Sequence, residues 1–192
     1  MSWQEPFKER ERAQEEHFFQ QRETVERDKA RAAHDREVAA RELGLTTGIS
    51  DQALLGELVD HEIRSETAAG FDLLPEVLIA WADGPPTRVQ REKIRSDARA
   101  RGIDHGASAA LLKSWLELRP APRLGDLWLE YTQARCQRMA PNERSLMRYA
   151  LLHDAGKLAR SARGFLGMRV RMSRKAAAQL SELEGPFDEA QH

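Results

Sequence analysis

The stretch PFKERERAQEEHFF, Pro6–Phe19, opens a run of charged residues that continues to Glu42. Proline is favoured in the first turn of a helix, because its missing N–H would have no intrahelical partner there. No further glycine or proline interrupts the run. Pairs such as Glu23 with Arg27 have the i,i+4 order that stabilises a helix by about 0.3 kcal/mol each. The sequence therefore predicts one long N-terminal helix with too little apolar surface to form a core of its own.

Composition limits the classes of protein to which the chain can belong. It has 192 residues, 30 of them basic and 31 acidic, and a formal charge of −1. This balance favours neither a nucleic-acid partner nor an anionic membrane. No apolar run approaches the roughly 20 residues that a membrane span needs, and the start lacks the apolar stretch of a secretory signal. We therefore expect a cytoplasmic protein that is not inserted in a membrane.

Beyond the charged helix, apolar residues recur at helical spacing in several segments that end at glycine or proline. Thr87 and Gln90 have the spacing of a capping box, and Ser173 is expected to cap the last helix. The apolar stripes, which include Leu146 and Tyr149, are expected to form the core. The predicted fold is all-α, with a helical arm over 1–43, a hinge over 44–50, a multi-helix bundle over 51–185 and a flexible tail over 186–192.

Four short motifs follow one another beyond the hinge: LIAWADG (78–84), an Arg-Glu pair (91–92), WLELRP (115–120) and GFLG (164–167). Their order and spacing resemble the TerB-like family of small all-helical domains. TerB-like proteins are linked to tellurite resistance and stress responses, and some are thought to bind divalent metal. The resemblance implies a helical bundle acting as a stress-response scaffold or metal-binding protein, with Asp83 as a candidate ligand.

The Asp83–Gly84 turn is superficially similar to a calcium-binding EF-hand loop. In that alignment, Ile79 and Trp81 would occupy ligand positions, and hydrophobic side chains cannot ligate calcium. The sequence therefore predicts that Asp83 turns or caps the chain.

The stretch LLHDAGKLAR (151–160) resembles the His-Asp signature of HD-domain metal-dependent phosphohydrolases. That resemblance implies His153 and Asp154 as ligands of a metal that activates water against a phosphoester. Such a site needs a further histidine and aspartate, for which His105 and Asp188 are the candidates. The simpler interpretation is a helix whose leucines face the core while His153, Asp154 and Lys157 face water.

No other feature points to catalysis. Cys136, the single cysteine, cannot form an internal disulfide, and a lone helical cysteine is more often a small buried residue than a nucleophile. The GFLG stretch lacks the lysine and the preceding strand of a phosphate-binding loop. We therefore expect a protein without enzymatic activity, cofactor or bound metal.

Several residues of the N-terminal helix resemble the inhibitory signature of the ATP synthase inhibitor-protein family. The matching residues are Phe7, Arg10, Glu11, Ala13, Glu15, Phe18 and Phe19. The bacterial zeta-type inhibitors share a similar phenylalanine and RERA opening, and His34-Asp35 stands where mitochondrial members carry a histidine next to an acidic residue. In that family, the helix wedges between catalytic subunits of the rotary ATPase, blocks ATP hydrolysis and makes the block depend on pH.

The resemblance implies roles for individual residues of the arm. Glu15 would pair with a positive group on the partner, Phe18 and Phe19 would fill an apolar pocket, and His34 would sense pH. Other interpretations remain open: the aromatic side chains pack back onto the chain's own domain, the helix pairs with a second copy, or it binds another protein.

Overall fold

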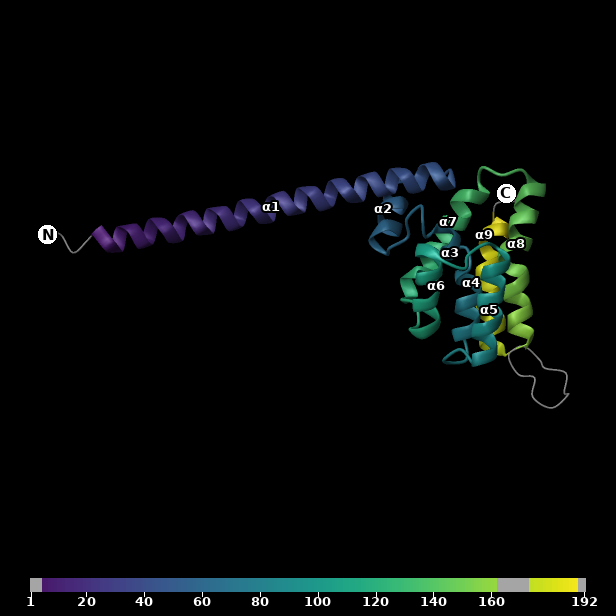
Figure 1. Cartoon of the computed structure of the whole chain (residues 1–192). Helices are drawn as coiled ribbons and strands as arrows, with labels where there is room; N and C mark the ends of the chain where they lie inside the picture. Colours follow the sequence, from purple (N-terminus) through teal and green to yellow (C-terminus); the bar gives the residue numbers. More distant parts are fainter. Residues whose placement is uncertain (1–4, 162–172, 190–192) are drawn as a thin grey trace. The chain divides into compact units, whose positions relative to one another are not determined.

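The computed structural model describes the backbone of residues 5–161 and 173–189, and the side chains of residues 17–158 and 173–188. Within these ranges all nine elements are helices, which confirms the predicted all-α class (Figure 1). None of the described helices has both the length and the apolar character that crossing a bilayer requires. The contacts divide the chain into two units, Met1–Ala39 and Ala40–His192.

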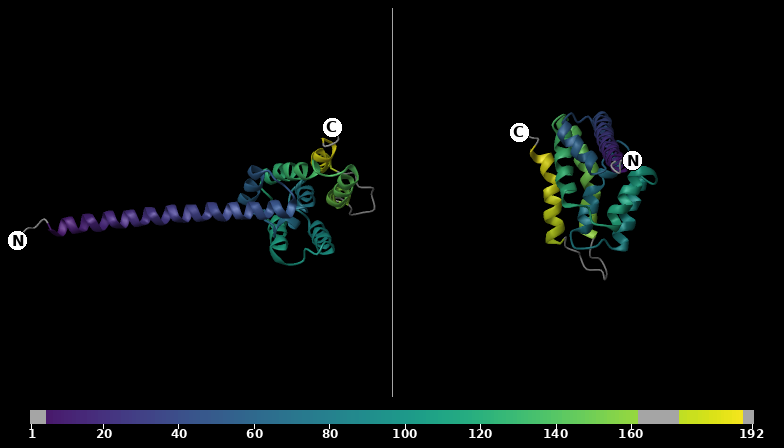
Figure 2. Two further views of the ribbon diagram at one scale, coloured as in Figure 1. Left: turned by 90° about the horizontal axis from the view of Figure 1, so that it is seen from above. Right: turned by 90° about the vertical axis from the view of Figure 1, so that its left-hand side faces the viewer.

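The first unit consists of the greater part of α1 (Glu5–Thr47), which is one continuous helix (Figure 2). Every residue from 17 to 38 is exposed. Glu23 pairs with Arg27 at 3.3 Å, as predicted, and Glu26 pairs with Lys29 at 3.1 Å. Such exposed ion pairs contribute little to stability. Residues 17–38 of this unit therefore contain no core.

The second unit begins with the last turns of α1, and here the structure differs from the predicted hinge over 44–50. The helix continues through Gly44 and ends at Thr47. Gly44 permits a close approach, because a Cβ at this position would lie 2.9 Å from the carbonyl oxygen of Ile49. Gly48 ends the helix instead: its φ is 75°, and its N–H donates to the Gly44 carbonyl at 2.9 Å, a common form of helix C-terminus.

Both predicted capping signals, at Thr87 and at Ser173, begin helices in the second unit, and Asp51 provides a third cap. The Asp51 carboxylate accepts from two backbone N–H groups of the next helix, Thr87 and Gln90 form the complete capping box, and the Ser173 hydroxyl accepts from the N–H of Ala176. The helices of this unit after α1 are α2 (Gln52–Asp60), α3 (Ala68–Phe71), α4 (Leu74–Trp81), α5 (Arg88–Ala100), α6 (Gly106–Glu117), α7 (Pro122–Cys136), α8 (Pro141–Ser161) and α9 (Arg174–Glu189).

Helix α4 lies at the centre of the second unit. It contacts α5, α6, α7, α8 and α9, and Figure 1 shows α4, α5, α8 and α9 running side by side. The largest side chains that are fully buried are Trp128, Tyr131, Phe71 and Phe187. Because α4 has neighbours on most sides, its short apolar sequence packs against several helices at once.

The expectation that Leu146 and Tyr149 belong to the core is wrong, because both side chains are exposed. Met147, Leu151 and Leu158 occupy the buried face of α8 instead. Residues three or four apart share a helix face, so Leu146 and Tyr149 fall on a different face from these three.

The flexible tail expected over 186–192 also differs from the structure. Helix α9 continues through Pro186 to Glu189, and Phe187 is buried. Arg148 of α8 pairs with Glu184 at 3.0 Å and with Asp188 at 3.4 Å, which holds this end of α9 against α8. Residues 190–192 and the GFLG motif (164–167) lie outside the described part of the chain.

Substituting Gly70→Ala tests the close packing of α3 against α6. A Cβ on Gly70 would lie 2.9 Å from the Ser108 carbonyl oxygen, a backbone atom that cannot easily move. We expect this substitution to lower the free energy of unfolding by about 1–3 kcal/mol in urea denaturation. The control is Gly185→Ala in α9, where a Cβ meets nothing within 4 Å and alanine should stabilise the helix by up to about 1 kcal/mol. Equal stabilities of the two variants would contradict the packing argument.

Candidate functional site

A buried carboxylate lies on the central helix of the second unit. Glu76 is the only charged residue of α4, and its side chain is 1% exposed. A glutamate is almost never fully buried unless it is paired. Because α4 is surrounded by other helices, the surroundings of Glu76 must come from residues distant in the sequence.

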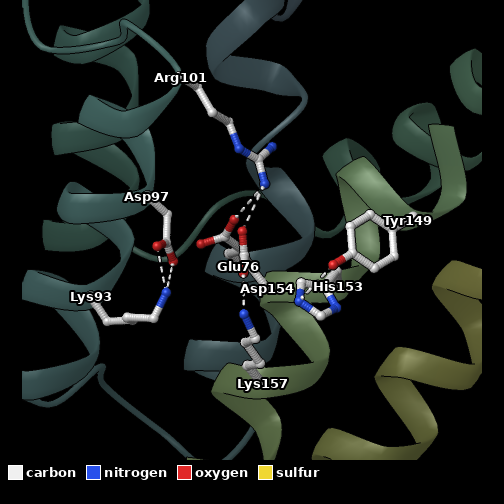
Figure 3. A network of polar contacts seen from close by, with 8 residues as sticks. All are labelled: Glu76, Lys93, Asp97, Arg101, Tyr149, His153, Asp154 and Lys157. Carbon is white, nitrogen blue, oxygen red and sulfur yellow. Dashed lines mark hydrogen bonds and ion pairs between the residues drawn. The ribbon is translucent and has the colours of Figure 1, made fainter. Parts of the chain in front are cut away.

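Two further carboxylates meet Glu76. Asp97 comes from α5 and Asp154 from α8, and one oxygen from each of the three residues lies within 4.8 Å of the other two (Figure 3). Asp97 and Asp154 are only partly exposed. Among the described side chains, these three form the one group of histidine, cysteine, aspartate and glutamate residues with the spacing of metal ligands. We refer to Glu76, Asp97 and Asp154 as the carboxylate cluster.

Three cationic side chains surround the carboxylate cluster. Arg101, at the C-terminal end of α5, donates to Glu76 at 3.2 Å and to Asp154 at 3.4 Å. Lys93 donates to both oxygens of Asp97. Lys157 lies 3.5 Å from Asp154. Each carboxyl group therefore has a cationic neighbour, and three cationic side chains face three acidic ones.

The surroundings shift the pKa values of Glu76 and Asp154 in opposite directions. Burial and the negative charge of Asp97 raise the pKa of Glu76 from 4.5 to about 8, against the opposing effect of Arg101. Burial also acts to raise the pKa of Asp154, but the positive charges of Lys93, Lys157 and Arg101 outweigh it, and the net shift is downward. Glu76 therefore holds its proton at neutral pH, and Asp154 is ionised.

Glu76 has one oxygen without a partner. Oε1 accepts from Arg101, whereas no donor of the protein reaches the buried Oε2, and a protonated Glu76 can share its proton with Asp97. An unsatisfied buried polar atom costs about 1–3 kcal/mol. Within the cluster, Oε2 of Glu76 is therefore the one buried oxygen that lacks a donor.

The arm carries the predicted partner-binding residues. Phe18 and Phe19 are 56% and 64% exposed, and their ring centroids lie 6.3 Å apart in an edge-to-face arrangement. The Arg22 guanidinium lies 5.9 Å from the Phe18 ring centroid. His34, the predicted pH sensor, is exposed on the same helix. The side chains of Phe7, Arg10, Glu11 and Glu15 lie outside the described part of the chain.

The candidate ligands for a His-Asp metal site are not brought together. His153 stacks on Tyr149 with ring centroids 4.2 Å apart, and it is not a member of the carboxylate cluster. His105 is exposed beside Asp104, whereas Asp188 pairs with Arg148. The expectation that Asp154 faces water is wrong, because it turns toward Arg101 and Glu76 (Figure 3).

Two other predicted positions have simpler surroundings. Asp83 is exposed in the turn after α4 and does not belong to the carboxylate cluster. Cys136 is fully buried, and burial raises the pKa of its thiol, which makes the thiol a poor nucleophile. The prediction that Cys136 is a buried residue is confirmed.

Glu76, Asp97 and Arg101 were not among the residues predicted from the sequence. A signal for Glu76 was present, since a single carboxylate inside the apolar run LLPEVLIAW requires a partner once the run is buried. Lys93, Asp97 and Arg101 are spaced four apart, so they share one face of α5. Nothing in the local sequence indicates that this face meets Glu76.

Replacing Glu76 with glutamine tests the raised pKa. The unfolded chain loses this proton near pH 4.5 and the folded chain near pH 8, so between these values the folded state binds more protons. The stabilisation from the retained proton is therefore complete below about pH 4.5 and is lost as the pH rises to about 8. Glutamine has no such proton to lose. The advantage of Glu76→Gln over the wild type should grow by up to about 1.4 kcal/mol per pH unit in this window.

The measurement is urea denaturation at several pH values in buffers free of divalent cations. Asp83→Asn removes an exposed carboxylate outside the cluster and should follow the pH dependence of the wild type. A difference between Glu76→Gln and wild type that is independent of pH would contradict the assignment of the proton.

Comparisons with known proteins give no match to this chain. No protein-family model matches it, no curated protein matches it, and no solved structure matches its fold. The resemblances to TerB-like domains and to ATP synthase inhibitor proteins therefore stay predictions. Function has to be argued from the arm and from the carboxylate cluster themselves.

Proposed function

We propose that this chain is a non-enzymatic regulatory protein whose N-terminal helix docks into a groove on a partner protein. The observation that carries the proposal is the exposed pair Phe18 and Phe19 on a helix whose residues 17–38 are all exposed. Large apolar side chains on an otherwise charged helix are typical anchors for helix-in-groove binding.

The energetics of the aromatic pair support this role. Removing a phenylalanine side chain from water is favourable by about 1.5–3 kcal/mol, and the two adjacent rings would enter a pocket together. Because α1 is one continuous helix, little further backbone ordering would be required on binding. The surrounding charges, such as Arg22 beside Phe18, would remain at the rim of the interface.

The best named candidate for the partner is a rotary ATPase, and the proposed effect is inhibition of its ATP hydrolysis. The support is the sequence signature from Phe7 to Phe19, which ends in the exposed aromatic pair. In this proposal Phe18 and Phe19 enter an apolar pocket between catalytic subunits, and Glu15 pairs with a positive group there. Pairing of two arms is the competing arrangement, since Phe18 and the exposed Val25 are seven residues apart.

A full-length Phe18→Ala/Phe19→Ala variant tests the docking helix. Wild-type protein at micromolar concentration should slow ATP hydrolysis by purified rotary ATPase from the same cell. The variant should be at least about tenfold less potent, because each lost aromatic anchor costs 1 kcal/mol or more. The matched control is Val25→Ala/Val38→Ala, which truncates two exposed residues of the same helix and should stay within about twofold of wild type.

Affinity capture from the native cell separates the general proposal from the named partner. Capture of a different protein that is lost in the Phe18→Ala/Phe19→Ala variant would retain the docking helix and reject the ATPase. Identical capture by wild type and variant would reject the docking helix. A dimer in solution that dissociates in the variant would indicate pairing of two arms.

His34 is tested by the pH dependence of inhibition. Protonation adds a positive charge to an exposed position of the helix, and we expect inhibition to strengthen below pH 7. His34→Gln keeps the polarity but cannot be protonated, so its potency should be the same on both sides of neutrality. The control is His17→Gln on the same helix, which should keep the wild-type pH dependence. A variant of His34 with an unchanged pH profile would remove it as the sensor.

A further inference from the structure

The carboxylate cluster in the second unit has the dimensions of a cation's ligand shell. One oxygen from each of Glu76, Asp97 and Asp154 lies within 4.8 Å of the other two. Two oxygens on opposite sides of a calcium ion, each about 2.4 Å from it, are about 4.8 Å apart, and neighbouring ligands are closer. Three helices therefore bring these oxygens to spacings that a single ion can bridge.

A second observation that points to a bound cation is the surroundings of the Glu76 carboxyl group. The Glu76 side chain is 1% exposed, and its Oε2 atom has no hydrogen-bond partner. Figure 3 shows the Glu76 carboxyl group between the side chains of Asp97 and Asp154. No donor of the protein reaches Oε2, so a cation among the three carboxyl groups would take the place of the Glu76 proton beside this atom.

The surrounding cations differ in how firmly they are held. Arg101 contacts two members of the cluster at once, and its side chain is mostly buried. The side chains of Lys93 and Lys157 are 40% and 52% exposed and end in flexible stems that can turn into solvent. With both lysines turned away and the Glu76 proton displaced by the ion, three carboxylates and one guanidinium carry a net charge of −2, which one divalent cation neutralises.

We propose that Glu76, Asp97 and Asp154 bind a hard divalent cation such as Ca²⁺ or Mn²⁺, with Lys93 and Lys157 displaced into solvent. A ligand set made only of carboxylate oxygens suits hard cations, whereas zinc sites are built mainly from histidine and cysteine. The site lies within the second unit and is independent of the docking helix.

Titration of the full-length protein with Mn²⁺, followed by the electron paramagnetic resonance signal of the free ion, tests this site. We expect one Mn²⁺ per chain, bound more tightly than millimolar and displaced by Ca²⁺. At a hundredfold excess over the dissociation constant, the cation should raise Tm by about 5 °C or more. The absence of binding below millimolar Mn²⁺ would overturn the proposal.

Three variants test the ligands and their competitors. Glu76→Gln keeps the shape of the side chain but cannot become a carboxylate, so it should weaken Mn²⁺ binding at least about tenfold. Lys93→Met removes a competing cation while keeping the apolar stem, so it should tighten binding by about threefold or more. Asp83→Asn, which changes an exposed carboxylate outside the cluster, should bind as wild type. Unchanged binding by Glu76→Gln, or weaker binding by Lys93→Met, would overturn the proposal.

Two controls keep these readings unambiguous. Circular dichroism establishes that each variant is folded. If Glu76→Gln does not fold, Mn²⁺ binding is measured on Asp97→Asn instead, with the same expected weakening. The Phe18→Ala/Phe19→Ala variant should bind Mn²⁺ as wild type does. Failure of the docking helix and failure of the cation site are therefore separate results.

Discussion

Burial of the Glu76 carboxyl group on the central helix α4 is the constraint on which the arrangement of the second unit depends. Helix α4 contacts five other helices, so a charged side chain at this position cannot reach water. The surrounding helices must therefore supply polar partners, and α5 and α8 do so through Asp97, Arg101 and Asp154. A buried polar group without partners is costly, so these contacts favour the packing in which α4, α5 and α8 meet at the cluster.

The helices were predictable from the sequence because their signals are local. Thr87 with Gln90 and Ser173 cap the helices that follow them, as the residue spacing indicates. The misplaced boundaries were decided by tertiary contacts instead. Gly44 lies where a Cβ would meet Leu55 of α2 as well as the nearby Ile49, and burial of Phe187 accompanies continuation of α9 past Pro186. The carboxylate cluster could not be predicted for the same reason, because its members come from three helices whose packing no local pattern specifies.

Different interactions stabilise the arm and the bundle. Over residues 17–38 the arm buries no apolar side chain, and its exposed ion pairs are individually weak. A helix of this kind depends on propensity and on a nucleus, since forming the first turn is the unfavourable step. The last turns of α1, with Leu43 fully buried, belong to the second unit and provide such a nucleus. Helix propagation from this anchored end explains how a charged segment remains helical without a core.

The free-energy cost of burying Glu76 can be compared with the cost of burying an apolar residue at the same position. An apolar residue of similar volume would fill its position without a dehydrated carboxyl group or an unpartnered oxygen, and replacing buried charged groups in this way is often neutral or stabilising. The packing of α4 alone therefore gives no reason for a glutamate. Holding a proton or a cation among Glu76, Asp97 and Asp154 is a task that an apolar residue cannot perform. The distribution of the cations agrees with this task, because Arg101 is held between two carboxyl groups, whereas the lysines that pair with Asp97 and Asp154 are partly exposed.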